Sequence, residues 1–283
     1  MGDKPQHAAE YPGAQSDAVR ELCLYVATKL GDVMDDLLVV GGLVPSLIVD
    51  QPPLGDAVEP HVGTMDLDVG LRVSLLSEGR YRKLTARLRD AGFSMDTNDA
   101  GNRTRQRWSV SSTRSATVDF LIPPTREGDK GGRLRDIEPD FAAIIAPGLH
   151  CAFRDRKRVT LTGTTIFGEQ ATRELWVCDA GAYVVLKALA FDSRGENKDA
   201  YDLYYVVRNY GAGPQDVGVK LRALLDDAEA QRAVAILQRD FAAPDAVGPK
   251  RVARFLSGGD DADVQADVVG FIGQLLAGVS RPG

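Results

Sequence analysis

The sequence predicts an α/β domain followed by a helical domain, and two observations favour this fold class. Short apolar runs typical of strands alternate with helix-like runs between residues 16 and 172, as in a mixed sheet covered by helices. Strand signals then stop, and residues 173–283 show a helical pattern interrupted by turns. We expect residues 1–15, rich in Pro, Gly and small polar side chains, to be disordered.

The elements of the first domain follow in a definite order. A first helix is expected from its N-cap Ser16 to its stop at Gly31, because apolar residues recur there at helical spacing. The later elements are expected to be a strand 37–40, a helix 43–49, a Pro-rich loop 50–63, a strand 65–69, a helix 78–90, a hairpin of strands 104–111 and 115–121, a mobile loop 125–140 and a strand 159–167. In the second domain, helices are expected to break at Gly195, at 211–214 and at 257–261.

Composition limits the classes of partner. The chain has 34 Lys and Arg against 40 Asp and Glu, a net charge of −6, which disfavours a protein that coats duplex DNA. Its three cysteines are too few and too widely spaced for a disulfide framework or a Cys-x-x-Cys metal site. The N-terminus lacks an apolar signal core, and the charge-free run 37–49 is too short to cross a bilayer. We therefore expect a cytoplasmic protein that does not bind membranes.

Paired glycines follow the first expected strand. Gly41 and Gly42 stand between a buried strand and a helix, where a backbone without side chains can approach a phosphate closely. Such a pair is also common in ordinary turns. The phosphate-binding interpretation depends on what lies beside them.

Three carboxylates stand inside apolar strands. Asp66 and Asp68 are two residues apart, so a strand would point both to one face, where a divalent cation relieves their repulsion. Asp119 lies within a second strand and becomes a third metal ligand if the strands are neighbours. Mg²⁺ or Mn²⁺ would suit such hard oxygen ligands. The alternative is a solvated strand face.

Charged residues also interrupt the helical domain. Lys187 lies among apolar neighbours on one helix face, so its amine either points inward to a phosphate or reaches past the packed stem to water. Asp202 lies opposite an apolar stripe, one turn after Lys198, which in isolation indicates a surface ion pair.

Together these blocks resemble the AbiEii/AbiGii (MenT-like) nucleotidyltransferase toxins of the polymerase-β-like superfamily. The resemblance covers roughly residues 35–210 and rests on Gly41-Gly42, on His61-Val62-Gly63-Thr64-Met65-Asp66-Leu67-Asp68, on Lys187-Ala188-Leu189-Ala190 and on Arg194-Gly195-Glu196-Asn197-Lys198-Asp199-Ala200-Tyr201-Asp202-Leu203. The last block is the most specific. One departure is the gap of 23 residues between Gly42 and Asp66, longer than is usual in the family. We expect the loop 50–63 to be an insertion that leaves the strand register intact.

The resemblance implies a polymerase-β-like nucleotidyltransferase domain with a mixed sheet over residues 16–172 and a function for each block. Asp66 and Asp68 would bind Mg²⁺ and nucleotide phosphates, Lys187 would contact the triphosphate, and Asp202 would act as a base or as a positioning residue. The implied reaction is attack of an RNA 3′-hydroxyl on the α-phosphate of an NTP. The RNA that we expect is tRNA. The implied setting is a toxin–antitoxin system in which transfer to tRNA blocks translation and a cognate antitoxin protein is the partner.

Further residues fit such a substrate. Arg103, Arg105 and Arg107 alternate on one strand face, and residues 154–158 add a second basic cluster; both are candidates for tRNA phosphate contacts or simply a solubilising surface. Lys198 and Arg107 are candidate nucleotide-binding residues. Thr64, expected on the same face as Asp66 and Asp68, is a candidate control point, because a phosphate there would add about −1.5 to −2 charge. Alternatively, its hydroxyl bonds only locally.

Three other functions compete with this interpretation. A haloacid-dehalogenase-like phosphatase also uses an Asp-x-Asp pair, but the residues that should follow it are missing here. A small-molecule, antibiotic-type nucleotidyltransferase shares the fold and the metal pair but lacks the block around Lys198 and Asp202. A catalytically inactive module that binds a nucleotide or a protein is the third alternative.

Overall fold

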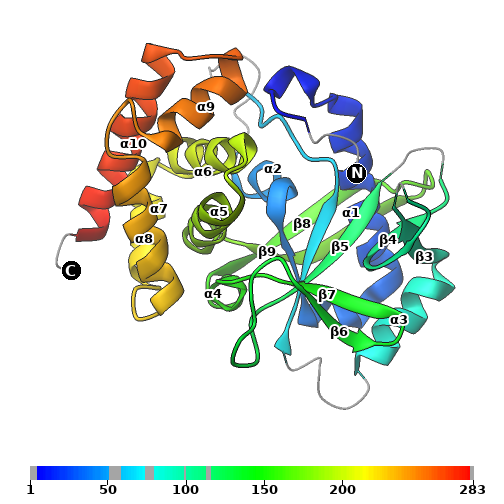
Figure 1. The fold of residues 1–283 in the computed structure, drawn as a ribbon. Helices are drawn as coiled ribbons and strands as arrows, with labels where there is room; N and C mark the ends of the chain where they lie inside the picture. The colour runs from blue at the N-terminus through cyan, green and yellow to red at the C-terminus, as the bar shows by residue number, and fades with distance from the viewer. Residues whose placement is uncertain (1–4, 51–58, 74–79, 99, 113–115, 281–283) are drawn as a thin grey trace. The chain divides into compact units, whose positions relative to one another are not determined.

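A computed structural model of the chain divides into two units, and each is described by itself (Figure 1). The structure describes residues 5–50, 59–73, 80–98, 100–112 and 116–280. Of these described residues, those within 11–44 and 63–178 belong to the first unit, and those within 5–10, 45–50, 59–62 and 179–280 belong to the second. Parts of the expected N-terminal segment, of the Pro-rich loop, of the expected helix 78–90 and of the hairpin turn lie outside the described residues.

A nine-stranded mixed sheet forms the first unit, as the expected fold class requires (Figure 1). Its main path has the order β3-β4-β5-β2-β1-β9-β8, and β7 pairs with both β5 and β6. The strands are β1 (Leu37–Val40), β2 (Leu67–Leu71), β3 (Phe93–Thr97), β4 (Arg103–Val110), β5 (Thr117–Ile122), β6 (Leu134–Glu138), β7 (Phe141–Ile145), β8 (Arg156–Thr164) and β9 (Gln170–Cys178).

The centre of this sheet consists of three short apolar strands. β1 pairs antiparallel with β2, placing Val40 opposite Asp68, and β2 pairs parallel with β5, placing Asp68 opposite Asp119. All four residues of β1 are buried, which explains why a run of Leu and Val without alternation forms a strand here. The long connection between β1 and β2 thus leaves their pairing in regular register.

Helices cover this sheet. α1 (Gly13–Leu30) packs against β8, β9 and α3 (Arg80–Asp90), and α4 (Leu149–Arg154) precedes β8. The expectation of a disordered start is wrong for the described residues before 16, because they include a 3₁₀ turn at Ala8–Glu10 and the first turn of α1. Pro12, rather than Ser16, is the N-cap, and the Ser16 hydroxyl instead accepts the N–H of Thr64 at 3.1 Å.

Several other expectations need correction. β2 begins at Leu67, two residues later than expected, because residues 65 and 66 form a bend. β6 lies within the expected mobile loop 125–140, where pairing with β7 stabilises a segment that is too polar to read as a strand. β9 runs through residue 172 and ends at Cys178, so the structure divides the chain there rather than at 172. The expected hairpin does form, since β4 and β5 pair antiparallel.

Helices make up the second unit. They are α5 (Ala180–Arg194), α6 (Asn197–Asn209), α7 (Pro214–Arg222), α8 (Ala228–Asp240), α9 (Val247–Ser257) and α10 (Ala262–Ser280), while the short α2 (Val44–Ile48) crosses in sequence from the first unit to the second. α5 ends at Gly195, whose φ of 64° favours glycine, and the expected breaks near 211–214 and 257–261 are confirmed. α6 packs between α5 and α9, and it is buried almost all round.

The last helix, α10, is both long and apolar. α10 is long and apolar enough to cross a membrane by length and composition alone, a test that single helices of soluble proteins also meet. Its buried residues, which include Val268, Ile272 and Leu275, recur at helical spacing, and the helix packs against α7 and α9.

Candidate functional site

Acidic and basic side chains meet across three neighbouring strands of the first unit. Asp68 on β2 lies opposite Asp119 on β5, and Asp119 lies opposite Arg107 on β4. Asp66 precedes β2 in the bend. We call these four residues the carboxylate group.

Arg107 binds two of the three carboxylates. Its Nε donates to Asp119 Oδ1 at 2.7 Å, and its Nη2 donates to Asp119 Oδ2 at 2.5 Å and to Asp66 Oδ2 at 3.0 Å. The hydrogen bonds that Arg107 donates to Asp119 raise the pKa of Arg107 despite partial burial. The side chain of Asp119 is 8% exposed, whereas that of Asp66 is 29% exposed. Asp119 is therefore the counter-ion of Arg107 in this structure, and Asp66 is the more accessible acid.

The paired glycines lie beside this group. Gly41 has a φ of 72°, and a Cβ built on it would stand 1.9 Å from Asp68 Oδ2. Any side chain at this position would displace the Asp68 carboxylate. Gly42 follows in the 3₁₀ turn Gly41–Leu43 and is buried. The glycine turn thus leaves room for an acid, which is a different use from the expected close approach to a phosphate.

Thr64 does not share a strand face with Asp66 and Asp68, because residues 61–66 lie outside β2. Its Oγ1 donates to the backbone oxygen of Asp66 at 3.2 Å, and its N–H donates to Ser16 Oγ at 3.1 Å. Thr64 is 4% exposed. The hydroxyl therefore has the local bonding role that we considered as the alternative to a control point.

A second polar cluster lies between α5 and α6 in the second unit. Lys187 Nζ lies 2.6 Å from Asp202 Oδ2 and 3.1 Å from Asp199 Oδ1. Lys198 Nζ donates to Asp202 Oδ1 at 2.6 Å. Arg194 donates to both oxygens of Asp199, at 2.6 and 2.8 Å. We call these five residues the lysine network.

Apart from Arg194, whose side chain is 49% exposed, the lysine network is buried, contrary to the surface pair that spacing alone indicates for Lys198 and Asp202. The side chain of Asp202 is 0% exposed and that of Lys187 is 9% exposed. Burial opposes every charge, but Lys187 and Lys198 outweigh it and hold the pKa of Asp202 well below its usual range. Asp202 and Asp199 in turn outweigh burial and raise the pKa of Lys187, whereas for Lys198 burial prevails and lowers the pKa.

His61 completes this network. Its Nε2 lies 2.8 Å from Asp202 Oδ1, and its side chain is 0% exposed. The imidazole stacks on Tyr201 with ring centroids 5.3 Å apart and meets the edge of Tyr205 at 4.9 Å. Burial and the neighbouring Lys198 lower the pKa of His61 to about 4. His61 and Asp199 lie within the motifs quoted above, but the sequence predicts no role for either. Nothing in the sequence shows that His61 reaches α6 or that both faces of α6 are covered.

Several members of the two basic clusters already contact other side chains. Besides Arg107, Arg105 pairs with Asp136 at 2.9 Å. Arg156 and Arg158 stand over the ring of Trp176, at 4.0 and 4.7 Å from its centroid, and Arg158 also pairs with an acid. Their contact with RNA stays a prediction.

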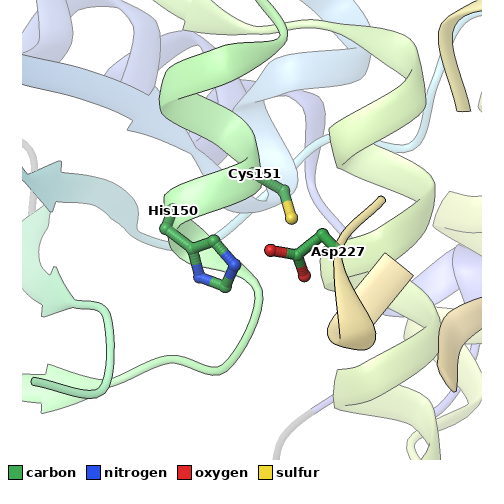
Figure 2. A group of neighbouring side chains, drawn as sticks. All are labelled: His150, Cys151 and Asp227. Carbon is green, nitrogen blue, oxygen red and sulfur yellow. The ribbon is translucent and has the colours of Figure 1, made fainter. Parts of the chain in front are cut away.

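Figure 2 labels three side chains of metal-binding type that belong to the two separately described units. His150 and Cys151 are consecutive residues of α4 in the first unit. Asp227, in the second unit, is the N-cap of α8 and accepts the N–H of Glu229 at 2.9 Å. We assign no joint role to them.

The carboxylate group fits a hard divalent cation in donor type. Asp66 and Asp68 supply oxygen ligands of the kind that Mg²⁺ prefers, and the glycine turn leaves space for the Asp68 carboxylate. In the part of the chain that the structure describes, the three acids do not form a closed three-ligand cage, since Arg107 binds both oxygens of Asp119. Asp119 as a metal ligand therefore stays a prediction that requires Arg107 to move.

Comparison with known proteins adds little to this description. No protein-family model matches the chain. A search of curated proteins finds no match either. Among solved structures, the chain is similar to an antigenic nucleotidyltransferase-like protein from Paracoccidioides brasiliensis, with 13% identity, a TM-score of 0.44, and coverage of 79% of this chain and 89% of that one. We take no residue role or activity from this likeness.

Proposed function

We propose that this protein is a Mg²⁺-dependent nucleotidyltransferase that transfers a nucleotide from an NTP to the 3′ end of an RNA, with tRNA as the first substrate to test. The observation that supports it best is the register of β2 and β5, which places Asp68 opposite Asp119 and beside a glycine turn shaped around its carboxylate. An inactive module has no need for a turn fitted to one acid. The assignment to RNA and to a toxin–antitoxin system rests on the resemblance of the sequence motifs.

In this proposal the acids of the first unit hold the metal ion. Asp66 and Asp68 would be its ligands, and when bound, Mg²⁺ would neutralise charge on the phosphates. Arg107 Nη2 donates to Asp66 Oδ2 at 3.0 Å, so a metal ion bound at that oxygen would displace this contact. Asp119 keeps Arg107 in place by accepting two hydrogen bonds.

The network of the second unit would bind phosphate oxygens. Lys187 would contact the triphosphate, and Lys198 would add a second cation. Asp202 is assigned to positioning rather than to proton abstraction, because each of its oxygens already faces an ammonium group at 2.6 Å. The RNA 3′-hydroxyl would attack the α-phosphorus, the bond to the β-phosphate oxygen would break, and pyrophosphate would leave without a covalent enzyme intermediate.

A substrate panel tests this proposal. Purified protein is incubated with total tRNA, with Mg²⁺ and with each α-labelled NTP in turn, and labelled RNA is resolved on a gel. We expect label at the 3′ end of RNA with at least one NTP. Transfer to an aminoglycoside-type small molecule but not to RNA would favour the antibiotic-type alternative.

A pair of glycine variants sharpens the test. Gly41→Ala and Gly168→Ala both place a Cβ at positive φ, 72° and 84°, but only the first would meet a neighbouring atom within 4 Å, Asp68 Oδ2. We expect Gly41→Ala to lose transfer and Gly168→Ala to keep it. Equal activity of the two would remove Gly41 from the site.

A further inference from the structure

The segment before the Asp-x-Asp pair is attached to α6 at three points. Tyr205 Oη donates to the backbone oxygen of Glu59 at 3.1 Å, and the N–H of Val62 donates to Tyr201 Oη at 3.2 Å. Between them, His61 reaches Asp202. All these residues belong to the second unit.

The direction of the His61 hydrogen bond follows from charge. Asp202 is ionised, because two ammonium groups lie 2.6 Å from its oxygens. An ionised carboxylate only accepts, so His61 Nε2 must carry the proton. Burial beside Lys198 and Lys187 keeps the imidazole neutral, so the proton lies on Nε2 alone.

The two oxygens of the Asp202 carboxylate have different partners. Oδ1 faces His61 and Lys198, and Oδ2 faces Lys187. Two hydrogen bonds at Oδ1, from His61 and Lys198, and one ion pair at Oδ2 thus fix the plane of the carboxylate, and with it the direction in which the Lys187 amine is held. Removing the histidine donor leaves the plane free to turn about its two remaining cations.

We propose that His61 is a positioning residue that orients the Asp202 carboxylate, and through it Lys187, for binding the phosphate groups of a nucleoside triphosphate. This inference rests on the proposed function. His61 touches no substrate; it sets the geometry of the amine that does. Its loss should therefore weaken nucleotide affinity more than it slows the chemical step.

Two substitutions separate the donor from the ring. His61→Phe keeps an aromatic ring against Tyr201 and Tyr205 but cannot donate, whereas His61→Gln loses the ring and carries an amide N–H at a similar reach. The control is His7→Phe, at a histidine of the same unit whose Nδ1 contacts the backbone oxygen of Arg254. Circular dichroism and thermal melting would be used to check that each variant is folded.

The first readout is binding of a fluorescent nucleoside triphosphate, with KM and kcat measured alongside. We expect His61→Phe to weaken affinity and raise KM about tenfold with kcat within about threefold, and His61→Gln to recover most of the loss. Affinity that is the same in His61→Phe and wild type overturns the inference while leaving the proposed function intact. A wild-type protein that binds no nucleoside triphosphate contradicts the proposed function, and the inference falls with it.

The second readout needs no variant for its main result. Nitrogen-15 NMR of the wild-type protein distinguishes the tautomers of its three histidines, with His61→Gln used to assign the signal. We expect His61 to be neutral and protonated on Nε2 at pH 6 to 7. A charged ring or the Nδ1-protonated tautomer in that range would overturn the inference even if His61→Phe fails to fold.

Discussion

The two polar groups of this molecule have opposite compositions, and Asp66 of the first is more exposed than Asp202 of the second. In the carboxylate group, three acids surround one guanidinium, and Asp66 is 29% exposed. In the lysine network, three cations face two acids, and Asp202 is 0% exposed. A group rich in acids attracts a cation, whereas one rich in cations attracts an anion. We infer that the first is suited to a metal ion and the second to phosphates.

Because Asp66 and Asp202 differ in burial, substitutions at the two positions should change the stability of the fold by different amounts. An exposed acid is replaced at little cost to folding, because water solvates what remains. A buried ion pair loses several kcal/mol when one partner is removed, because the other charge is stranded. Substitutions in the carboxylate group should thus reveal chemistry, and those in the lysine network should reveal stability as well.

The largest effect is expected at Asp66. Asp66→Asn should abolish nucleotide transfer with little change in melting temperature, since the proposed metal loses a charged ligand. Transfer assays and circular dichroism measure the two effects. Asp90→Asn, at an exposed acid at the end of α3, is the matched control and should stay active. Normal transfer by folded Asp66→Asn would contradict the role of the whole carboxylate group.

Lys187 should behave differently from Asp66. Lys187→Met strands Asp202 and Asp199, so we expect the free energy of unfolding to fall by about 3–5 kcal/mol in addition to a loss of activity. Denaturant melts of Lys187→Met beside Asp66→Asn decide the matter. Equal stability of the two variants would contradict the expected difference in folding cost between the carboxylate group and the lysine network.

A smaller effect should appear in the pH dependence of stability. His61 has a pKa of about 4 in the folded protein, below its ordinary value of 6.5, so protons bind the unfolded chain more readily between these values. The free energy of unfolding should therefore fall as the pH drops from 6.5 towards 4, by at most about 3 kcal/mol. Above pH 4.5 the aspartates contribute little to this slope. A slope between pH 6.5 and 4.5 that is unchanged in His61→Gln would contradict the assignment.

The smallest effect is expected at Thr64. Thr64→Val removes one hydrogen bond, from Oγ1 to the backbone oxygen of Asp66, at a cost of about 1 kcal/mol, and should leave transfer largely intact. Thr64→Glu buries a charge at a position that is 4% exposed and should destabilise the fold as well as block activity. If Thr64→Glu is inactive but as stable as wild type, the control-point interpretation regains support.

The sequence predicted the strands around Asp68 better than the rest of the sheet. β1 was predicted residue for residue because four consecutive apolar residues end at a glycine pair. β3, β6, β7 and β9 were not predicted. β6 and most of β9 are polar, and only pairing with β7 and β8 identifies these two segments as strands.

Site residues were predictable where the residue type is unusual for its position. An acid within an apolar strand, such as Asp119, is conspicuous, as is Lys187 on an apolar helix face. The partners were not predictable: nothing in the sequence shows that Arg107 binds Asp119 or that His61 reaches Asp202. Those contacts join residues 12 and 141 positions apart, and only the folded chain brings them together.

The most direct test of nucleotidyl transfer uses two labels on the same NTP. Wild-type protein, RNA and Mg²⁺ are incubated with either α-labelled or γ-labelled NTP, and label is followed in RNA and in pyrophosphate. We predict that the α label enters RNA, that the γ label leaves as pyrophosphate, and that neither occurs with Asp66→Asn. Release of the γ label as free phosphate, with no α label in RNA, would contradict nucleotidyl transfer.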